Sequence, residues 1–190
     1  MQQLRPAYGA GGAIVLYHFT NSFPYLLNRV GVRIAELFSQ RVRPYGVTLQ
    51  MYRVLAALSE RPAQRLSDLS GMTTIEVSTL SRLVGTMKRQ GLVTKRRLGH
   101  NARTVEIDLT AKGRSLTAEL IPIASHFEDV AIGNSSPKEI QKIKRFLKES
   151  YDSLNVIQAE VSALRRTARA STHPPRQAVR VPGFRERPLD

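Results

Sequence analysis

Apolar residues recur every three or four positions over most of this chain, which is the spacing of helices that each bury one face. The first helix is expected to begin near Asn21 or Ser22 and to end before Pro44. A second is expected to begin at the N-cap residue Thr48 and to end at Pro62. Their apolar faces comprise Leu27, Val30, Ile34, Leu37 and Phe38, and then Met51, Val54, Leu55 and Leu58.

The middle of the chain predicts a short helix, a turn, a longer helix and a hairpin. The short helix is expected over residues 66–70, with Gly71 in the turn, and the longer one over residues 74–90. The helical spacing then gives way to two segments that favour strands, Val93 to Leu98 and Thr104 to Leu109. This order is that of a winged helix-turn-helix, in which one helix is sized for a DNA major groove.

Two further helices are predicted after the hairpin. Thr110 is expected to cap the first of them, and Pro122 is expected to kink it. The second begins at the capping box of residues 136–139. Its apolar positions follow a 3–4 repeat, which is typical of a helix that packs along another helix. They are Ile140, Leu147, Leu154 and Val161 in one set, and Ile143, Ile157 and Leu164 in the other, with Ser150 as a gap.

The predicted fold is therefore mainly α with a small β-wing, in the α+β class. The expected parts are an N-terminal arm over residues 1–20, a main domain over 21–164 and a disordered basic tail over 165–190. Within the main domain the winged helix-turn-helix is expected over about 48–110, between helical regions at about 21–43 and 111–164. The tail holds seven Arg, four Pro and two acidic residues, a composition that does not bury enough apolar surface to fold. It is either a second DNA-contacting arm or a solvated end.

Charge favours a polyanionic partner. The 190 residues carry a net charge of +14, and residues 61–103 hold nine Lys and Arg against Asp68 and Glu76. Because this surplus coincides with the helix-turn-helix pattern, double-stranded DNA is favoured over an anionic membrane or an acidic protein. The chain has no cysteine and no apolar run near the ~20 residues of a membrane span, so we expect a cytoplasmic protein without disulfides.

The candidate DNA contacts lie on the longer helix and on the hairpin. Short hydroxyl side chains let a helix approach DNA closely, and Arg82 is long enough to reach a guanine edge with two hydrogen bonds. A thin basic hairpin fits a narrow minor groove. The candidates are Thr73, Thr74, Ser78, Thr79, Ser81, Arg82, Arg89, Lys95, Arg96, Arg97, His100, Asn101 and Arg103.

Catalytic and metal sites are not expected. The four histidines are far apart in sequence and no cysteine assists them, so no metal is predicted. The glycine-rich stretch at residues 9–13 follows no strand, which argues against a phosphate-binding loop. No nucleophile elbow or pair of carboxylates in catalytic register is present. We therefore expect no enzyme activity and no cofactor, with an enzyme using the glycine loop as a distant alternative.

Two segments, SxLSRLVGTMKRQGLV and NARTVEIDLTAKG, resemble the MarR family of bacterial transcription regulators. The resemblance covers about residues 21–160. Family members usually carry Asp, Arg, Arg at the wing tip, where this chain has Asn101, Ala102 and Arg103. Arg103 thus matches the family's minor-groove arginine, whereas Asn101 replaces the residue that braces the wing. The resemblance implies a homodimer built from the first, fifth and sixth helices.

MarR-like proteins generally bind ligands between the dimerisation helices and the winged domain. The candidate effector-binding residues here are Tyr25, Arg29, Arg41, Arg43, Tyr45, Tyr52 and His126. Tyrosines and arginines suit an aromatic acid, a phenol or an acyl-CoA thioester. The expected function is thus a repressor of a near-palindromic operator that a small anionic or aromatic effector releases. The alternative is an architectural protein that binds DNA without sequence preference and has no effector.

Overall fold

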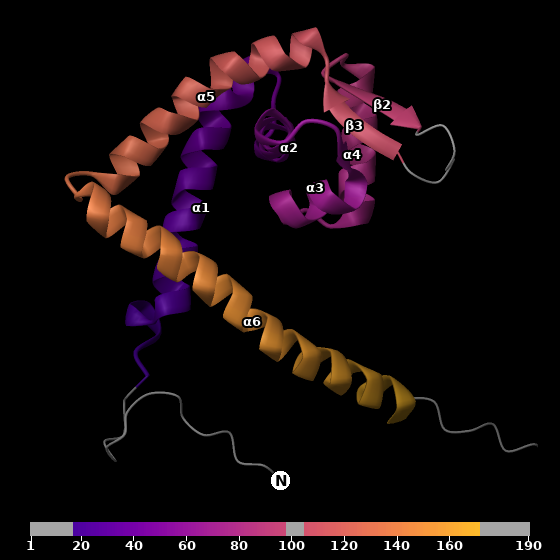
Figure 1. Ribbon diagram of the computed structural model, residues 1–190. Helices are drawn as coiled ribbons and strands as arrows, with labels where there is room; N and C mark the ends of the chain where they lie inside the picture. Colours follow the sequence, from indigo (N-terminus) through magenta and orange to yellow (C-terminus); the bar gives the residue numbers. More distant parts are fainter. Residues whose placement is uncertain (1–16, 98–104, 172–190) are drawn as a thin grey trace, which may run out of the picture. The chain divides into compact units, whose positions relative to one another are not determined.

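Helices and one small sheet make up the described part of the chain, as predicted (Figure 1). The computed structural model describes residues 17–97 and 105–171. Helices α1 to α5 belong to one compact unit that ends at Gly133, and α6 belongs to a second that begins at Asn134. The elements are η1 (Phe19–Asn21), α1 (Phe23–Val42), η2 (Arg43–Tyr45), α2 (Leu49–Glu60), β1 (Gln64–Arg65), α3 (Leu66–Thr73), α4 (Val77–Arg89), β2 (Val93–Arg97), β3 (Val105–Leu109), α5 (Ala111–Ile132) and α6 (Pro137–Ser171).

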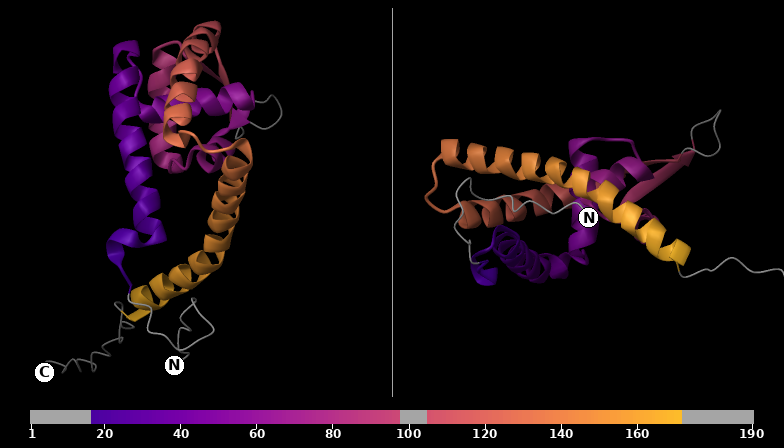
Figure 2. Two further views of the ribbon diagram at one scale, coloured as in Figure 1. Left: turned by 90° about the vertical axis from the view of Figure 1, so that its left-hand side faces the viewer. Right: turned by 90° about the horizontal axis from the view of Figure 1, so that it is seen from below.

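Helix α2 is the centre of the first unit. It lies between α1 and the α3–α4 pair, with α5 packed against it (Figures 1 and 2). Its apolar face is buried as the spacing predicts. Apolar side chains from α1, α3, α4, both wing strands and α5 join it in one core, which holds the helix-turn-helix and the base of the wing as a single body. The most buried members include Val42, Val54, Leu55, Leu69, Leu80, Val84, Met87, Ile107 and Leu120.

The sheet has three antiparallel strands in the order β1-β3-β2. The two wing strands were predicted to within one residue at each described end. The short strand β1 was not predicted, because two residues are too few to show an alternating pattern. It pairs Gln64 with Ile107 and Arg65 with Glu106, and so ties the entry of α3 to the wing.

Local capping explains where several helices begin. The Thr48 hydroxyl accepts a hydrogen bond from the Met51 amide at 3.2 Å, and the Thr110 hydroxyl accepts one from the Gly113 amide at 2.9 Å. At the start of α6 the Ser136 amide donates to the Glu139 carboxylate at 2.8 Å, which completes the predicted capping box. These three helix starts are confirmed.

The helix-turn-helix corrects two predicted boundaries. Gly71 was expected in the turn but lies inside α3, and the chain turns instead at Thr74, whose φ is 55°. A glycine inside a helix costs only about 1 kcal/mol, and burial of Leu69 and Thr73 offsets that cost. Helix α4 consequently begins at Val77 rather than at Thr74.

Helix α6 runs for 35 residues to Ser171, so the predicted start of the tail at residue 165 is wrong by seven residues. Residues 172–190 lie outside the described part of the chain. Residues of both sets in the 3–4 repeat are exposed, among them Ile143, Leu154 and Ile157. Within the described residues, none of the helices is long and apolar enough to span a membrane.

Gly113, in the first turn of α5, is where the wing and α5 approach most closely. A Cβ at this position would collide with the carbonyl oxygen of Leu92 and lie 3.0 Å from its carbonyl carbon. The Thr110 amide also donates to that carbonyl at 3.1 Å, so the backbone cannot easily move away. Close approach to backbone, rather than a positive φ, explains the glycine.

We expect Gly113→Ala to lower the free energy of unfolding by about 1–3 kcal/mol, the usual cost of inserting a group into a packed site. Urea unfolding followed by circular dichroism measures this. Gly31→Ala is the matched control. It also replaces a glycine inside a helix, but a Cβ at that position meets nothing within 4 Å. Equal free energies of unfolding for the two variants would show that the backbone around Leu92 can shift to accommodate the added methyl group.

Candidate nucleic-acid interface

Helix α4 separates a buried apolar face from an exposed polar face. Leu80, Val84 and Met87 are buried in the core. Ser78, Thr79 and Arg82 are exposed near the start of the helix, as predicted, and Ser81 is half-buried. An exposed helix face with short hydroxyl groups and a guanidinium group suits the approach of a helix to base edges in a major groove.

Glu76 is the N-cap of α4, a role that the sequence did not reveal. Its carboxylate accepts hydrogen bonds from the amides of Ser78 at 2.9 Å and Thr79 at 3.1 Å, and also from the Ser78 hydroxyl. The Ser78 hydroxyl, those two amides and the nearby positive charge of Arg82 together lower the pKa of Glu76. The carboxylate is therefore ionised at neutral pH.

Thr73 is not a DNA contact, contrary to the prediction. Its side chain is only 4% exposed, and its hydroxyl donates to the Leu69 carbonyl at 2.6 Å within α3. The prediction failed because it placed Thr73 in the turn, whereas the residue forms the last turn of α3. Thr74 is exposed, and its hydroxyl donates to the Thr73 carbonyl at 2.7 Å.

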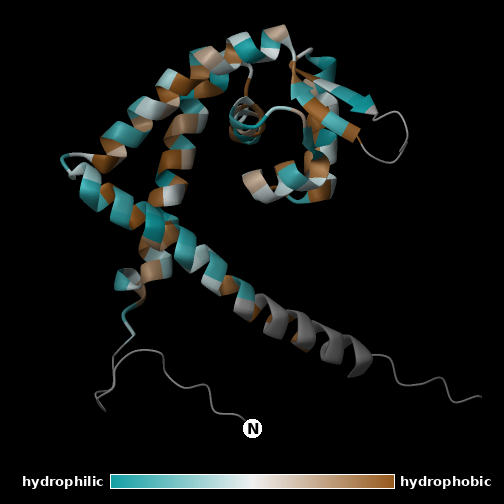
Figure 3. Cartoon of the chain, viewed as in Figure 1, coloured by the Kyte–Doolittle hydropathy of each residue, from teal (hydrophilic) through white to brown (hydrophobic). Residues whose placement is uncertain are grey.

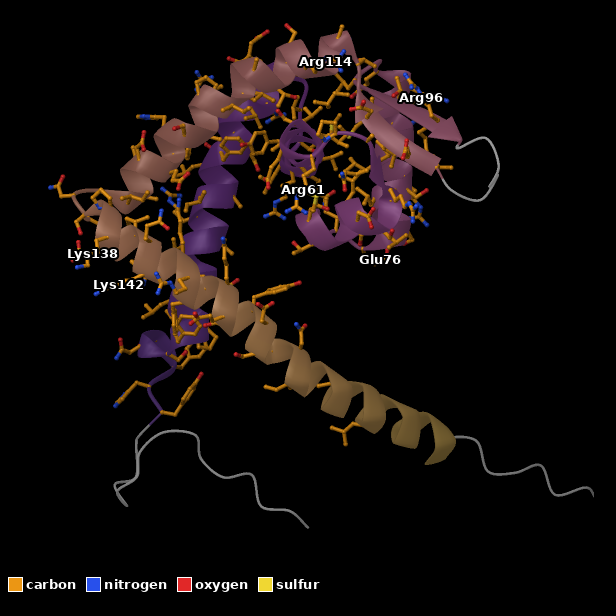
Figure 4. The ribbon with its side chains drawn as sticks, in the orientation of Figure 1. Arg61, Glu76, Arg96, Arg114, Lys138 and Lys142 are labelled. Atoms are coloured by element: carbon orange, nitrogen blue, oxygen red, sulfur yellow. The ribbon has the colours of Figure 1, made fainter. Side chains whose placement is uncertain are left out.

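The wing strands bring cations beside α4. Lys95 and Arg96 lie on β2 opposite Ile107 and Glu106 of β3, and Figure 4 shows Arg96 on the wing. Arg89, at the far end of α4, donates to the Thr86 hydroxyl at 3.0 Å and is exposed. The side chain of Arg97 and the whole of His100, Asn101 and Arg103 lie outside the described residues. Their predicted DNA contacts stay predictions.

A groove of about 370 Å³ lies between α4 and the wing strands. Its lining includes Ser81 of α4, Lys95 of β2, Arg65 of β1 and Ser67 of α3. Arg65 and Ser67 were not predicted, because only the pairing of β1 with β3 brings them to this surface. Two cations and two hydroxyl groups around one groove form a surface suited to a backbone phosphate.

The candidate effector residues do not gather in one place. A cavity of about 610 Å³ lies between α1 and α5, and only Arg29 and His126 of the seven candidates line it. Arg33 also lines it and was not predicted. The complete lining is Leu26, Arg29, Val30, Arg33, Ile34, Leu37, His126, Phe127, Val130 and Ala131.

The other five candidates lie elsewhere. Arg41 and Arg43 are exposed at the end of α1 and do not line the cavity. Tyr25 packs on Phe19 with ring centroids 4.7 Å apart. Tyr52 packs on the buried Phe38 at 4.6 Å, and its burial raises the pKa of its hydroxyl. Tyr45 is half-buried against the same core.

The described residues also bear on whether the chain holds a metal site or a buried polar binding site. In residues 17–97 and 105–171, no three His, Cys, Asp or Glu side chains are grouped so that they could hold a metal ion. Every buried side-chain nitrogen or oxygen in these residues has a hydrogen-bond partner within the protein, so none of them needs a ligand to complete its hydrogen bonding. The arrangement is one for binding through exposed groups.

Together, the α3–α4 pair, the exposed polar face of α4 and the basic antiparallel wing define a winged helix-turn-helix DNA-binding protein. A family model described as MarR family matches residues 45–104. The transcriptional repressor NicR of Pseudomonas putida is 24% identical over 137 residues, which cover 72% of this chain and 87% of NicR. The repressor IacR of the same species is 21% identical over 136 residues, which cover 71% of this chain and 81% of IacR.

Solved structures agree with the sequence relatives. BpsR of Bordetella bronchiseptica superposes with a TM-score of 0.66 at 28% identity, over 72% of this chain and 98% of BpsR. A MarR family regulator of Silicibacter pomeroyi gives a TM-score of 0.67 at 25% identity, over 72% of this chain and 92% of its own. In sequence and in fold the chain is therefore similar to MarR family transcriptional regulators.

Proposed function

We propose that this protein is a sequence-specific repressor that binds a near-palindromic operator as a homodimer. The exposed face of α4 beside a cationic groove and wing carries the proposal, because it supplies both base-reading and phosphate-binding groups. The chain's similarity to NicR, a transcriptional repressor, supports repression rather than activation. The apolar repeat on α6 supports the dimer.

Selection of bound duplexes from a random library tests the proposal. We expect an enriched near-palindrome, because two copies of α4 enter successive major grooves about 34 Å apart. Affinity for that site should exceed affinity for random DNA by at least ~10³ at the same salt concentration. The net charge of +14 favours the rival architectural function, which predicts no enriched sequence and a ratio near one.

We further propose that the cavity between α1 and α5 binds a small aromatic carboxylate. Arg29 and Arg33 supply positive charge, although Arg33 also pairs with Glu36 at 3.0 Å. Leu26, Val30 and other apolar side chains form walls that suit an aromatic ring. BpsR, whose DNA binding is described as regulated by 6-hydroxynicotinic acid, makes that compound the first probe to use. A ligand bound between α1 and α5 would change the distance between the two α4 helices of the dimer.

Replacing both Arg29 and Arg33 with Ala is expected to weaken binding of the effector by about tenfold or more, since hydrogen bonds to charged groups contribute ~1.5–3 kcal/mol each. Operator affinity without ligand should be unchanged. In the intact protein, ligand and operator should oppose each other with a coupling of ~1–3 kcal/mol. Calorimetric titration of 6-hydroxynicotinic acid and a panel of benzoic acids, with and without operator, measures both quantities.

Arg41→Ala/Arg43→Ala is the matched control, because it removes the same charge from the end of α1 and the start of η2, outside the cavity. We expect it to bind the ligand as the unaltered protein does. If the control double variant loses ligand affinity and the Arg29/Arg33 variant keeps it, the effector site lies at the end of α1 instead.

A further inference from the structure

Glu76 places a negative charge on the surface proposed to face DNA. Residues 61–103 hold nine cations and only two acids, Asp68 and Glu76. Helix α4 itself contains no acidic residue, and its N-cap Glu76 places a carboxylate at its N-terminal end (Figure 4). A carboxylate here repels the phosphates of every sequence and lowers affinity for DNA in general. A compensating interaction with particular bases would offset that repulsion.

The hydrogen bonds of Glu76 leave one of its oxygens available. The two amides and the hydroxyl described above all donate to Oε2. Among the residues that the structure describes, none donates to Oε1. The side chain is exposed, and its three bonds hold it at the start of α4 instead of leaving it to rotate freely.

The same bonds change what the helix start can bind. A free helix N-terminus attracts phosphate through its unpaired amides. In this protein Glu76 already occupies the amides of Ser78 and Thr79. The start of α4 is therefore suited to a hydrogen-bond donor on DNA rather than to a phosphate.

We propose that Glu76 determines specificity by accepting a hydrogen bond, through Oε1, from the N4 amino group of a cytosine in the major groove. This inference rests on the proposed function as an operator-binding protein. Cytosine offers a donor at its major-groove edge, whereas guanine offers only the acceptors N7 and O6, which a carboxylate repels. Arg82, whose positive charge is close enough to act on Glu76, suits a guanine in the same half-site.

Helix capping alone is the competing explanation for Glu76. Serine is one of the best N-cap residues, and it carries no charge and does not extend to the bases. Glu76→Ser therefore separates the two roles, because it keeps a cap on α4 and removes the reading group. Glu119→Ser is the matched control, since it removes the same charge from an exposed position on α5.

The experiment is selection of duplexes from a random library by the full-length protein and both variants, followed by titration at one salt concentration. For Glu76→Ser we expect the cytosine preference to vanish at one position per half-site. Affinity for the best site should fall about tenfold per half-site, in line with one hydrogen bond to a charged group in each. Affinity for random DNA should rise severalfold, because a repulsive charge is gone. Glu119→Ser should select the same site as the unaltered protein.

Three results would overturn the inference. An unchanged base preference in Glu76→Ser would make Glu76 a cap only, and an equal gain of affinity on all sequences would make it a source of repulsion only. If thermal melting shows that Glu76→Ser unfolds, Glu76→Gln replaces it; an unchanged cytosine preference in that variant also overturns the inference, since the amide loses the charge that rejects guanine. If the unaltered protein selects no sequence at all, the proposed function itself fails.

Discussion

Leu154→Glu is expected to convert the protein from dimers to monomers or aggregates and to abolish operator binding. Leu154 lies in the 3–4 repeat of α6 and is 60% exposed. A helix that leaves Leu154, Ile157 and Val161 exposed needs another helix to cover them. A buried Glu side chain would face apolar surface without a partner, which costs several kcal/mol.

The loss of DNA binding is expected because a monomer contacts the operator with one α4 helix instead of two. A dimer holds two reading helices on one duplex, and joining two binding modules raises overall affinity by ~10²–10⁴ over a single module. Analytical ultracentrifugation measures the assembly state, and operator titration measures affinity. We expect the affinity of Leu154→Glu for the selected operator to fall by at least ~100-fold.

Asn155→Glu is the matched control for this variant. It adds the same charge one residue further along α6, at an exposed position outside both apolar sets. It should remain dimeric and keep most of its operator affinity. A Leu154→Glu protein that sediments as a dimer and binds operator normally would show that the α6 repeat does not form the interface.

The elements that could be predicted are those determined by neighbouring residues. Thr48 and Thr110 cap their helices through bonds that span three residues, so the sequence alone indicates them. The strand β1 depends on pairing with residues more than 40 positions away, and no local pattern marks it. The burial of Thr73 is likewise a tertiary effect, because propensity alone makes Gly71 the better place for a turn.

The same distinction between local and tertiary features applies to the candidate site. The exposure of Ser78, Thr79 and Arg82 follows from helical periodicity and was predicted. Arg65 could not be assigned, because its place in the groove depends on the β1–β3 pair. The effector candidates rest on residue type and on the family resemblance, neither of which locates a cavity, and the cavity lies between the middle of α1 and the end of α5.

Arg82→Ala is expected to weaken operator binding by ~1–3 kcal/mol in each half-site and to relax the preference at one base pair there. Arg82 is exposed on α4, on the turn that follows Ser78 and Thr79. A guanidinium group there suits O6 and N7 of a guanine, a pairing that alanine cannot replace. Because the dimer carries two copies, the two losses should combine to about 2–6 kcal/mol on a palindrome.

Arg89→Ala provides the comparison, since Arg89 is an exposed arginine at the opposite end of the same helix. Its charge lies where a backbone phosphate, rather than a base edge, is the expected contact. Losing it should weaken binding to all sequences alike and reduce the salt dependence by about one phosphate contact per subunit. Titrations of both variants on the selected operator and on random DNA, at several salt concentrations, separate the two roles. An equal loss on both DNAs for Arg82→Ala would make Arg82 a phosphate contact and leave the reading of bases to the other exposed groups of α4.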